Sequence, residues 1–170
     1  MSNQLAAARE EFVAQWGTMG SVWGINRTMA QVHALLMISD RPLHTDEIMK
    51  ELSISRGSAN TSLRELVNWG VARSVIMKGE RKEHFESERD VWRMFCAIAR
   101  ERKRREIEPV IKALESCREQ TDSLKSADAV AFNKTVSELL DFVSIISSAL
   151  DRIGRSEQST ILPMLLKFLK

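Results

Sequence analysis

Proline and glycine, the residues that most often interrupt regular structure, are scarce in this sequence, with three prolines and seven glycines among 170 residues. A fold made only of β-strands needs a turn about every ten residues, and such turns rely on these two residue types. The scarcity therefore excludes that class. Alanine, leucine, glutamate, lysine and arginine are abundant instead and favour helices. We expect a mainly α-helical protein of one domain, or one small domain with a helical extension, for which 44% hydrophobic residues suffice.

A long apolar run is also missing. The longest uncharged stretch, from Phe12 to Asn26, is interrupted by glycines and polar residues and is shorter than the ~20 apolar residues of a membrane-spanning helix. The N-terminus does not start with basic residues followed by an apolar block, as a signal peptide does. We therefore expect no membrane partner and a cytoplasmic location.

Residues suited to metal binding, disulfide formation or catalysis are few. Cys96 and Cys117 lie on apolar faces of expected helices without a CxxC spacing, so we interpret them as reduced packing residues. The histidines show no HExxH or HxxxH spacing, and the sequence contains no GxSxG or GxxxxGK motif. These absences predict a protein that is not an enzyme and that has no metal site and no cofactor.

An excess of charge of one sign is missing as well, since the formal net charge is only +2. A value this small does not indicate a polyanionic partner by itself, so the positions of the charges matter more. Basic residues cluster at 78–82 (KGERK) and at 100–105 (RERKRR). We interpret the second cluster as a solvated helix face that pairs with neighbouring glutamates, with a second nucleic-acid contact as the alternative.

Hydrophobic spacing predicts two helices in the first part of the chain. One covers residues 3–19 and is ended by the glycines at positions 17, 20 and 24. The other follows an Asn26 cap, continues to about Ser39 and faces a core with its apolar stripe. We expect residues 1–25 to contribute to the core or to a dimer.

A helix-turn-helix arrangement is predicted next. His44 or Thr45 caps a short helix, and Ser55 caps a longer helix that runs to Trp69 and stops at Gly70. The two helices meet across a tight connection, although this turn lacks the glycine often found there.

A basic β-hairpin follows these helices. Residues 71–77 are rich in β-branched side chains, residues 78–81 form a turn, and residues 82–87 form a second extended run. Its tip carries Lys78, Arg81 and Lys82, which in a winged-helix protein would lie against the DNA backbone or minor groove. We therefore assign residues 26–89 to a winged helix-turn-helix domain.

A long helix is expected to begin at Asp90, with Val91, Phe95 and Ile98 directed inward. Pro109 lies inside this helix and removes a backbone hydrogen bond. We therefore predict a kink or a break between residues 105 and 109.

A heptad pattern marks the C-terminal part of the chain. Such a pattern predicts a helix packed along its length on another helix, within the fold or in a symmetric dimer, and we expect a homodimer. Residues 90–170 then form a helical dimerisation region, whose last residues, 159–170, are interpreted as an arm that packs on the dimer, with an interfacial membrane helix as the alternative. The seam comprises Phe132, Val136, Leu139, Val143, Ile146, Leu150 and Ile153.

The polar face of the fourth helix indicates a partner for the winged domain. Small and forked polar side chains recur there at helical spacing, opposite Ala59, Leu63 and Leu66. Such side chains in the first turns of a helix can reach base edges in the major groove, whereas a face rich in glutamate would repel phosphates. We therefore expect double-stranded DNA as the partner. The candidate DNA-binding residues are Thr45, Ser55, Arg56, Gly57, Ser58, Asn60, Thr61, Arg64, Lys78, Arg81 and Lys82.

The stretches ISRGSANTSLREL, NWGVAR, KGERKEHFE and DVWRMF are the most specific parts of a resemblance that covers residues 26–120. This region resembles the MarR-type winged-helix repressors, specifically the branch of the glycine-betaine-synthesis repressor GbsR. The resemblance implies a homodimeric repressor on a palindromic operator, with the recognition helix and wing at the positions given above. It also implies osmoprotectant genes as targets and a choline-like or betaine-like osmolyte as effector. His44 departs from the family pattern, which has Ser or Thr at this cap.

Tyrosine is absent from the chain, so an aromatic site for a cationic osmolyte would have to use tryptophan and phenylalanine. Trp16, Trp23, Trp92 and Phe95 are the candidates, and packing in the core is the alternative interpretation of these residues. The alternative function for the whole chain is a protein-interaction module that uses the winged helix and the seam without DNA. Salt would separate the two, because DNA binding weakens steeply with ionic strength and an apolar protein contact does not.

Overall fold

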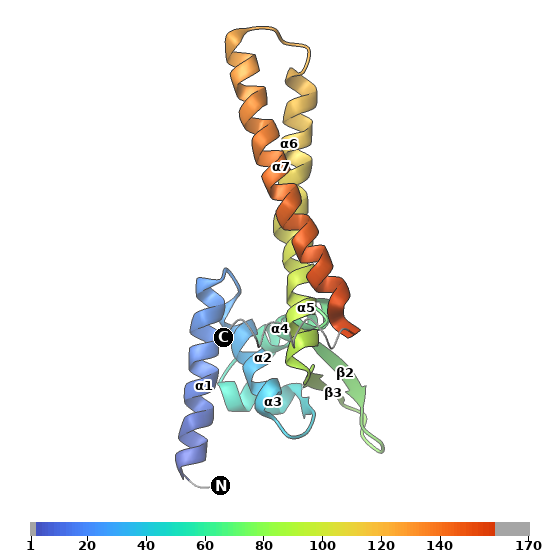
Figure 1. The fold of residues 1–170 in the computed structure, drawn as a ribbon. Coiled ribbons are helices and arrows are strands. Elements are labelled where there is room, and N and C mark those ends of the chain that lie inside the picture. Colours follow the sequence, from blue (N-terminus) through green and yellow to red (C-terminus); the bar gives the residue numbers. More distant parts are fainter. Residues whose placement is uncertain (1–2, 159–170) are drawn as a thin grey trace, which may run out of the picture. The chain divides into compact units, whose positions relative to one another are not determined.

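The computed structural model describes residues 3–158, which are mostly helical and include one three-stranded antiparallel sheet (Figure 1). The expected fold class, mainly α with a small β-hairpin, is confirmed. The chain divides into two compact units at the boundary between Met94 and Phe95. The arm expected at 159–170 lies outside the described residues. The elements are α1 (Asn3–Val22), α2 (Arg27–Ile38), β1 (Leu43–His44), α3 (Thr45–Leu52), α4 (Arg56–Asn68), β2 (Ala72–Ile76), β3 (Glu83–Ser87), α5 (Val91–Arg102), a π-helical turn (Lys103–Ile107), α6 (Glu108–Thr121), α7 (Ala127–Arg155) and a 3₁₀ turn (Ser156–Gln158).

Helix α1 does not end at its first glycines, so the expected end near residue 19 is wrong. Gly17 and Gly20 are buried inside the helix, where α1 approaches α2 too closely for a side chain. A Cβ added to Gly17 would lie 2.6 Å from Cγ of Gln31, and one added to Gly20 would lie 2.5 Å from Cβ of Ala30. This contact outweighs the low helix propensity of glycine, and the turn falls instead at Gly24, whose φ is +75°.

The hairpin β2–β3 forms as predicted, and it gains a third strand that the sequence analysis missed. The strand order is β1-β3-β2, and both neighbouring pairs are antiparallel. In β1, Leu43 pairs with Phe85 and His44 pairs with His84. Two residues are too few to show the alternation by which a strand is recognised, so β1 follows from the tertiary pairing alone.

The core of the first unit lies between helices α2, α3, α4 and the sheet. The side chains of Val32, Ile48, Leu63, Leu66 and Val71 are at most 1% exposed. Asn26 caps α2, as expected, by accepting the backbone N–H of Met29 at 3.1 Å. The order helix, strand, two helices and hairpin is that of a winged helix-turn-helix.

The helix expected to break before Pro109 continues through it. Between α5 and α6 the backbone forms the π-helical turn Lys103–Ile107, with Pro109 in the first turn of α6. The missing N–H of proline is thus accommodated by a locally widened helix. Of the two predicted alternatives, a kink or a break, the break is wrong, and the irregularity expected near residues 105–109 takes the form of this π-helical turn.

The inward face expected for α5 is wrong for Val91 and Phe95, while Ile98 is partly buried. Val91 is 72% exposed and Phe95 is 45% exposed, whereas Met94, Cys96 and Ala97 are buried. The small side chains of Cys96 and Ala97 allow the face that is buried to pack closely. A prediction based on the spacing of large apolar residues does not find such a face. The thiol of Cys96 donates to the backbone carbonyl of Ile153 in α7 at 3.1 Å, in agreement with its interpretation as a packing residue.

Helices α6 and α7 form an antiparallel helical hairpin in the second unit (Figure 1). Ser126 caps α7 by accepting the N–H of Ala129 at 3.2 Å. Within the pair, Val136 and Leu140 of α7 are buried, while α6 contains no residue that is buried to the same degree. The hairpin therefore has a thin core.

Candidate nucleic-acid interface

Helix α4 presents the polar face that the sequence predicts. Its N-cap Ser55 accepts the backbone N–H of Ser58 at 3.2 Å, and its apolar side, formed by Ala59, Leu63 and Leu66, is at most 1% exposed. The opposite side carries exposed residues at Arg56, Gly57, Thr61 and Arg64 and partly exposed ones at Ser58 and Asn60. The helix is therefore anchored by one face and has the other available for a ligand.

The preceding helix α3 is fixed by His44, which fills the cap position as one of the two expected alternatives. Its Nδ1 accepts the N–H of Asp46 at 3.1 Å and of Glu47 at 3.4 Å, while the Glu47 carboxylate accepts the N–H of His44 at 3.0 Å. A hydrogen bond from Arg41 lowers the pKa of Glu47 to about 2, so this carboxylate stays charged. Thr45 is then the first residue of the helix and not its cap.

The turn between α3 and α4 contains Ser53 where a glycine is common. Its φ of +53° places it in the left-handed region, which residues other than Gly, Asn and Asp rarely adopt. The tight geometry of the helix-turn-helix is therefore kept without the usual residue.

A groove of about 410 Å³ lies between α4 and the sheet. It brings together Thr45, Asn60 and Arg64, which were predicted from separate segments of the sequence. Asn68, Ser74 and Glu83 also line it and were not predicted from the sequence. Ser74 and Glu83 hydrogen bond to each other across the hairpin, a contact that depends on the register of β2 and β3.

The cations on this surface fall into two groups. Arg64, Lys78 and Arg81 are exposed and form no ion pair with any residue among 3–158. Arg56 and Lys82, by contrast, both pair with Asp46 of α3, and the distance from Lys82 Nζ to Asp46 Oδ2 is 2.8 Å. Hydrogen bonds from Lys82 and then Arg56 lower the pKa of the Asp46 carboxyl below its ordinary value. Sequence reasoning did not identify Asp46 as part of this surface.

The basic run 100–105 is paired with acidic residues, as the solvated-face interpretation predicts. Glu101 is buried and accepts hydrogen bonds from Arg104 and Arg105, which lower its pKa. Lys103 contacts Asp151 of α7 at 2.9 Å, and this bond raises the pKa of the lysine. These pairs account for the cluster without a nucleic acid.

The heptad seam of α7 is divided by the structure. Val136 is buried against the same chain, and Val143, Ile146, Leu150 and Ile153 are partly buried. Phe132 and Leu139 remain 45% and 47% exposed. Phe142 and Ile145 were not predicted from the sequence. They are more exposed still, at 61% and 68%, and extend the apolar surface of α7. Phe142 follows Leu139 by three residues, so a search for a second stripe in the same helix could have found it.

The four candidate aromatic residues are spread over both compact units. Trp16 packs on Phe12 and His33, with ring centroids 5.6 Å and 6.2 Å apart. Burial lowers the pKa of His33 to about 4, so its imidazole is neutral. Trp23 and Phe95 are exposed, Trp92 is partly exposed, and Phe95 alone belongs to the second unit.

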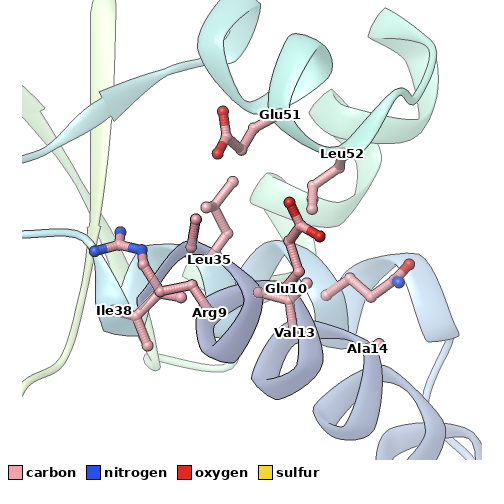
Figure 2. A pocket seen from close by; sticks show the side chains of 10 residues that line it. Arg9, Glu10, Val13, Ala14, Leu35, Ile38, Glu51 and Leu52 are labelled. Atoms are coloured by element: carbon pink, nitrogen blue, oxygen red, sulfur yellow. The ribbon is translucent and has the colours of Figure 1, made fainter. Parts of the chain in front are cut away.

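A hollow of about 340 Å³ between α1, α2 and α3 is shown in Figure 2. Its floor is apolar, with Val13 and Leu35, and its rim carries Arg9, Glu10 and Glu51. The ten residues that line it include none of the four aromatic candidates.

Two other features are absent from residues 3–158. No group of three or more His, Cys, Asp or Glu side chains in this range could hold a metal ion. No helix in the same range is long and apolar enough to cross a membrane.

Curated relatives of the chain are distant. No protein-family model matches it. Two relatives from Bacillus subtilis (strain 168) are the HTH-type transcriptional repressor GbsR, 26% identical over 94 residues, and the HTH-type transcriptional repressor OpcR, 21% identical over 91 residues. These matches cover 55% and 54% of this chain and 52% and 49% of the relatives, so the chain spans about half the length of the curated relatives it matches.

A solved structure is similar over a larger part of the chain. It is titled as the crystal structure of a transcriptional regulator, and the similarity covers 89% of this chain and 99% of that one with a TM-score of 0.72. The sequence identity is 20%, so this likeness shows the fold. The distant homologues of the chain are HTH-type transcriptional repressors and regulators.

Proposed function

We propose that the protein is a transcriptional regulator, acting as a repressor, that binds a palindromic DNA operator as a homodimer. The observation that carries the proposal concerns two elements on either side of one groove. Helix α4 is anchored by its apolar side and has an outer face of uncharged polar residues and arginines. The other element is the basic wing. Arg64 can reach a guanine edge, and Asn60 can reach an adenine edge, in the forked geometry that these bases accept. Lys78 and Arg81 have no ion pair among residues 3–158 and can contact phosphates.

Binding to DNA of selected sequence tests this function. Selection from a random duplex pool should enrich an inverted repeat whose half-sites lie about one helical turn, ~10 bp, apart. Arg64→Ala should reduce the ratio of operator to random affinity, because a bidentate base contact discriminates by about 1–3 kcal/mol. Arg81→Ala should weaken binding to both duplexes equally and flatten the salt dependence.

Two outcomes would contradict the proposal. Specific binding that survives simultaneous replacement of Asn60, Thr61 and Arg64 by alanine would mean that α4 is not the recognition helix. An association that is insensitive to salt and needs no DNA would favour the protein-interaction module instead.

A homodimer is part of the proposal because two recognition helices are needed for two half-sites. The exposed apolar side chains of α7, Phe132, Leu139, Phe142 and Ile145, support it, since large apolar stripes on a soluble surface mark interaction sites. We infer that α7 packs on α7 of a second copy along this stripe.

We further propose that the regulator belongs to the GbsR branch of the MarR-type repressors, controls osmoprotectant genes and responds to a cationic or zwitterionic osmolyte. The similarity to GbsR supports this assignment. Trp92 lies at the start of α5, directly after the wing, and is partly exposed, so a bound cation could lie over its indole face.

Tryptophan fluorescence tests the effector. Choline or glycine betaine should change the emission in a saturable way, and Trp92→Ala should abolish the response while Trp23→Ala leaves part of it. Operator affinity measured with and without the solute should then differ by a factor of about 5–150, the usual range of coupling between two sites. An emission spectrum that stays constant into the millimolar range would remove these solutes as effectors.

A further inference from the structure

Asp46 occupies an unusual position for a carboxylate. It lies in the first turn of α3 and contacts a cation from each of two other elements, Arg56 at the start of α4 and Lys82 directly before β3 in the wing. Lys82 is 36 residues away in the sequence, so the contact exists only in the folded winged domain. One side chain thus joins the three elements of the proposed DNA-binding surface.

Neither fold stability nor helix capping accounts for this carboxylate. The side chains of Asp46, Arg56 and Lys82 are 38%, 62% and 60% exposed, and ion pairs at such exposure contribute little to stability. The N-terminus of α3 is already capped by His44 and carries a second acidic residue, Glu47. A negative charge on a surface that faces phosphates also opposes binding. Asp46 therefore opposes DNA binding, and the stability of the fold does not require this carboxylate.

We propose that Asp46 competes with DNA phosphates for Arg56 and Lys82 and thereby limits sequence-independent DNA affinity. The inference rests on the proposed function of the winged domain. In the unbound protein both cations are held by the carboxylate, so each phosphate contact they form must displace it. Binding to random DNA depends almost entirely on phosphate contacts, whereas operator binding also uses base contacts by Asn60 and Arg64, which Asp46 does not touch. Asp46 is then a residue that determines specificity by weakening the wrong complexes.

Asp46→Asn tests the proposal in the full-length protein with a random-sequence duplex and an operator duplex. The variant keeps the shape of the side chain and releases two cations. Affinity for random DNA should rise roughly tenfold at low salt, the salt dependence should steepen by about two counterions, and the ratio of operator to random affinity should fall. Asp46→Glu, which restores a carboxylate, should return random-DNA affinity toward that of the wild type.

Glu51→Gln provides the matched control. It removes the same charge from the same helix. Glu51 lies on the side of α3 that faces the hollow of Figure 2 and forms no ion pair with a residue in 3–158. Because distant exposed charges are screened by salt, its effect on random-DNA affinity should stay below about twofold. Asp46→Asn added to a protein that already carries Arg56→Ala and Lys82→Ala should have an equally small effect.

Each outcome decides the inference. If the wild type binds random DNA and the Asp46→Asn variant binds it equally or more weakly, the inference is overturned. Weaker binding by the variant would indicate that Asp46 holds the two cations in positions that favour DNA contact. An equal gain from Glu51→Gln would overturn it too, since the effect would then be general charge. A wild-type protein that binds no duplex would overturn the proposed function and this inference with it.

Discussion

The two compact units bury their apolar residues in different ways. In the winged unit, side chains such as Ile48, Leu63 and Leu66 are at most 1% exposed. In the helical hairpin, α6 has no buried residue, and Phe142 and Ile145 of α7 are more than half exposed. The first unit thus has a core of its own, whereas much of the apolar surface of the second is left to be covered. Under the proposed function, recognition would then depend on a self-sufficient module and assembly on an incomplete one.

The largest expected effect comes from charges on the apolar stripe of α7. Leu139→Asp with Phe142→Asp should raise the dissociation constant of the proposed dimer by at least about a hundredfold, because each unpaired carboxylate buried in an interface costs several kcal/mol. Sedimentation measures the change, and circular dichroism checks that the helices persist. Lys134→Asp with Glu138→Lys, which alters exposed polar residues of the same helix, is the control. Unchanged sedimentation of the double aspartate variant would place the dimer contact elsewhere.

Truncating one leucine in each unit sharpens the comparison. Leu66→Ala should lower the free energy of unfolding by about 2–5 kcal/mol, because Leu66 is 1% exposed and its removal leaves a cavity. Leu124→Ala, at 51% exposure in the α6–α7 connection, should change it by no more than about 0.5 kcal/mol. Urea unfolding measures both. Similar losses for the two variants would contradict the picture of one complete core and one incomplete one.

A pH dependence is expected from the core of the first unit alone. Burial lowers the pKa of His33 to about 4 from the ordinary 6.5, so between these values the unfolded chain binds a proton that the folded chain does not. The contribution is constant above pH 6.5, and the free energy of unfolding should fall by about 3 kcal/mol as the pH drops to 4. His33→Leu, which cannot titrate, should reduce this slope. An equal slope in both proteins would assign the acid sensitivity to other groups.

The smallest effect concerns the cap of α3. His44→Ala removes the acceptor for the N–H groups of Asp46 and Glu47 and should cost about 1 kcal/mol in urea unfolding. His44→Ser retains a capping oxygen and should cost less than the alanine variant. If serine and alanine are equally destabilising, the edge-to-face contact of His44 with His84 is what matters, since these ring centroids lie 5.5 Å apart at an interplanar angle of 81°.

Local chemistry explains what could be predicted from the sequence. Asn26, Ser55 and Gly70 mark helix ends through contacts with their own neighbours, so α2, α4 and the wing were found at nearly their observed limits. The same holds for the polar outer face of α4, because helical spacing alone sets which residues share a side.

Contacts between distant segments explain what could not. Gly17 and Gly20 look like helix ends until α2 is placed against them, and β1 exists only because β3 pairs with it. Which face of α5 is buried depends on small residues such as Cys96, which contribute little to a prediction based on the spacing of large apolar side chains. The partner of Lys82 could not be inferred either, since a long side chain at the wing can reach several acidic residues.

The π-helical turn Lys103–Ile107 has a consequence for how this chain tolerates insertions and deletions. A π-helical turn accommodates one residue more than the α-helix it interrupts, and one residue of α-helix corresponds to a rotation of about 100°. Deleting one residue here could restore regular α-helical hydrogen bonding and would turn every side chain of α6 by that angle relative to residues 95–102. Ile111 and Leu114, which now lie partly buried on the α7 side, would move to a different side of the helix. The turn thus sets the rotation of α6 about the helix axis relative to residues 95–102. Among related chains, we expect a change of length at this point to occur together with a shifted apolar pattern in α6.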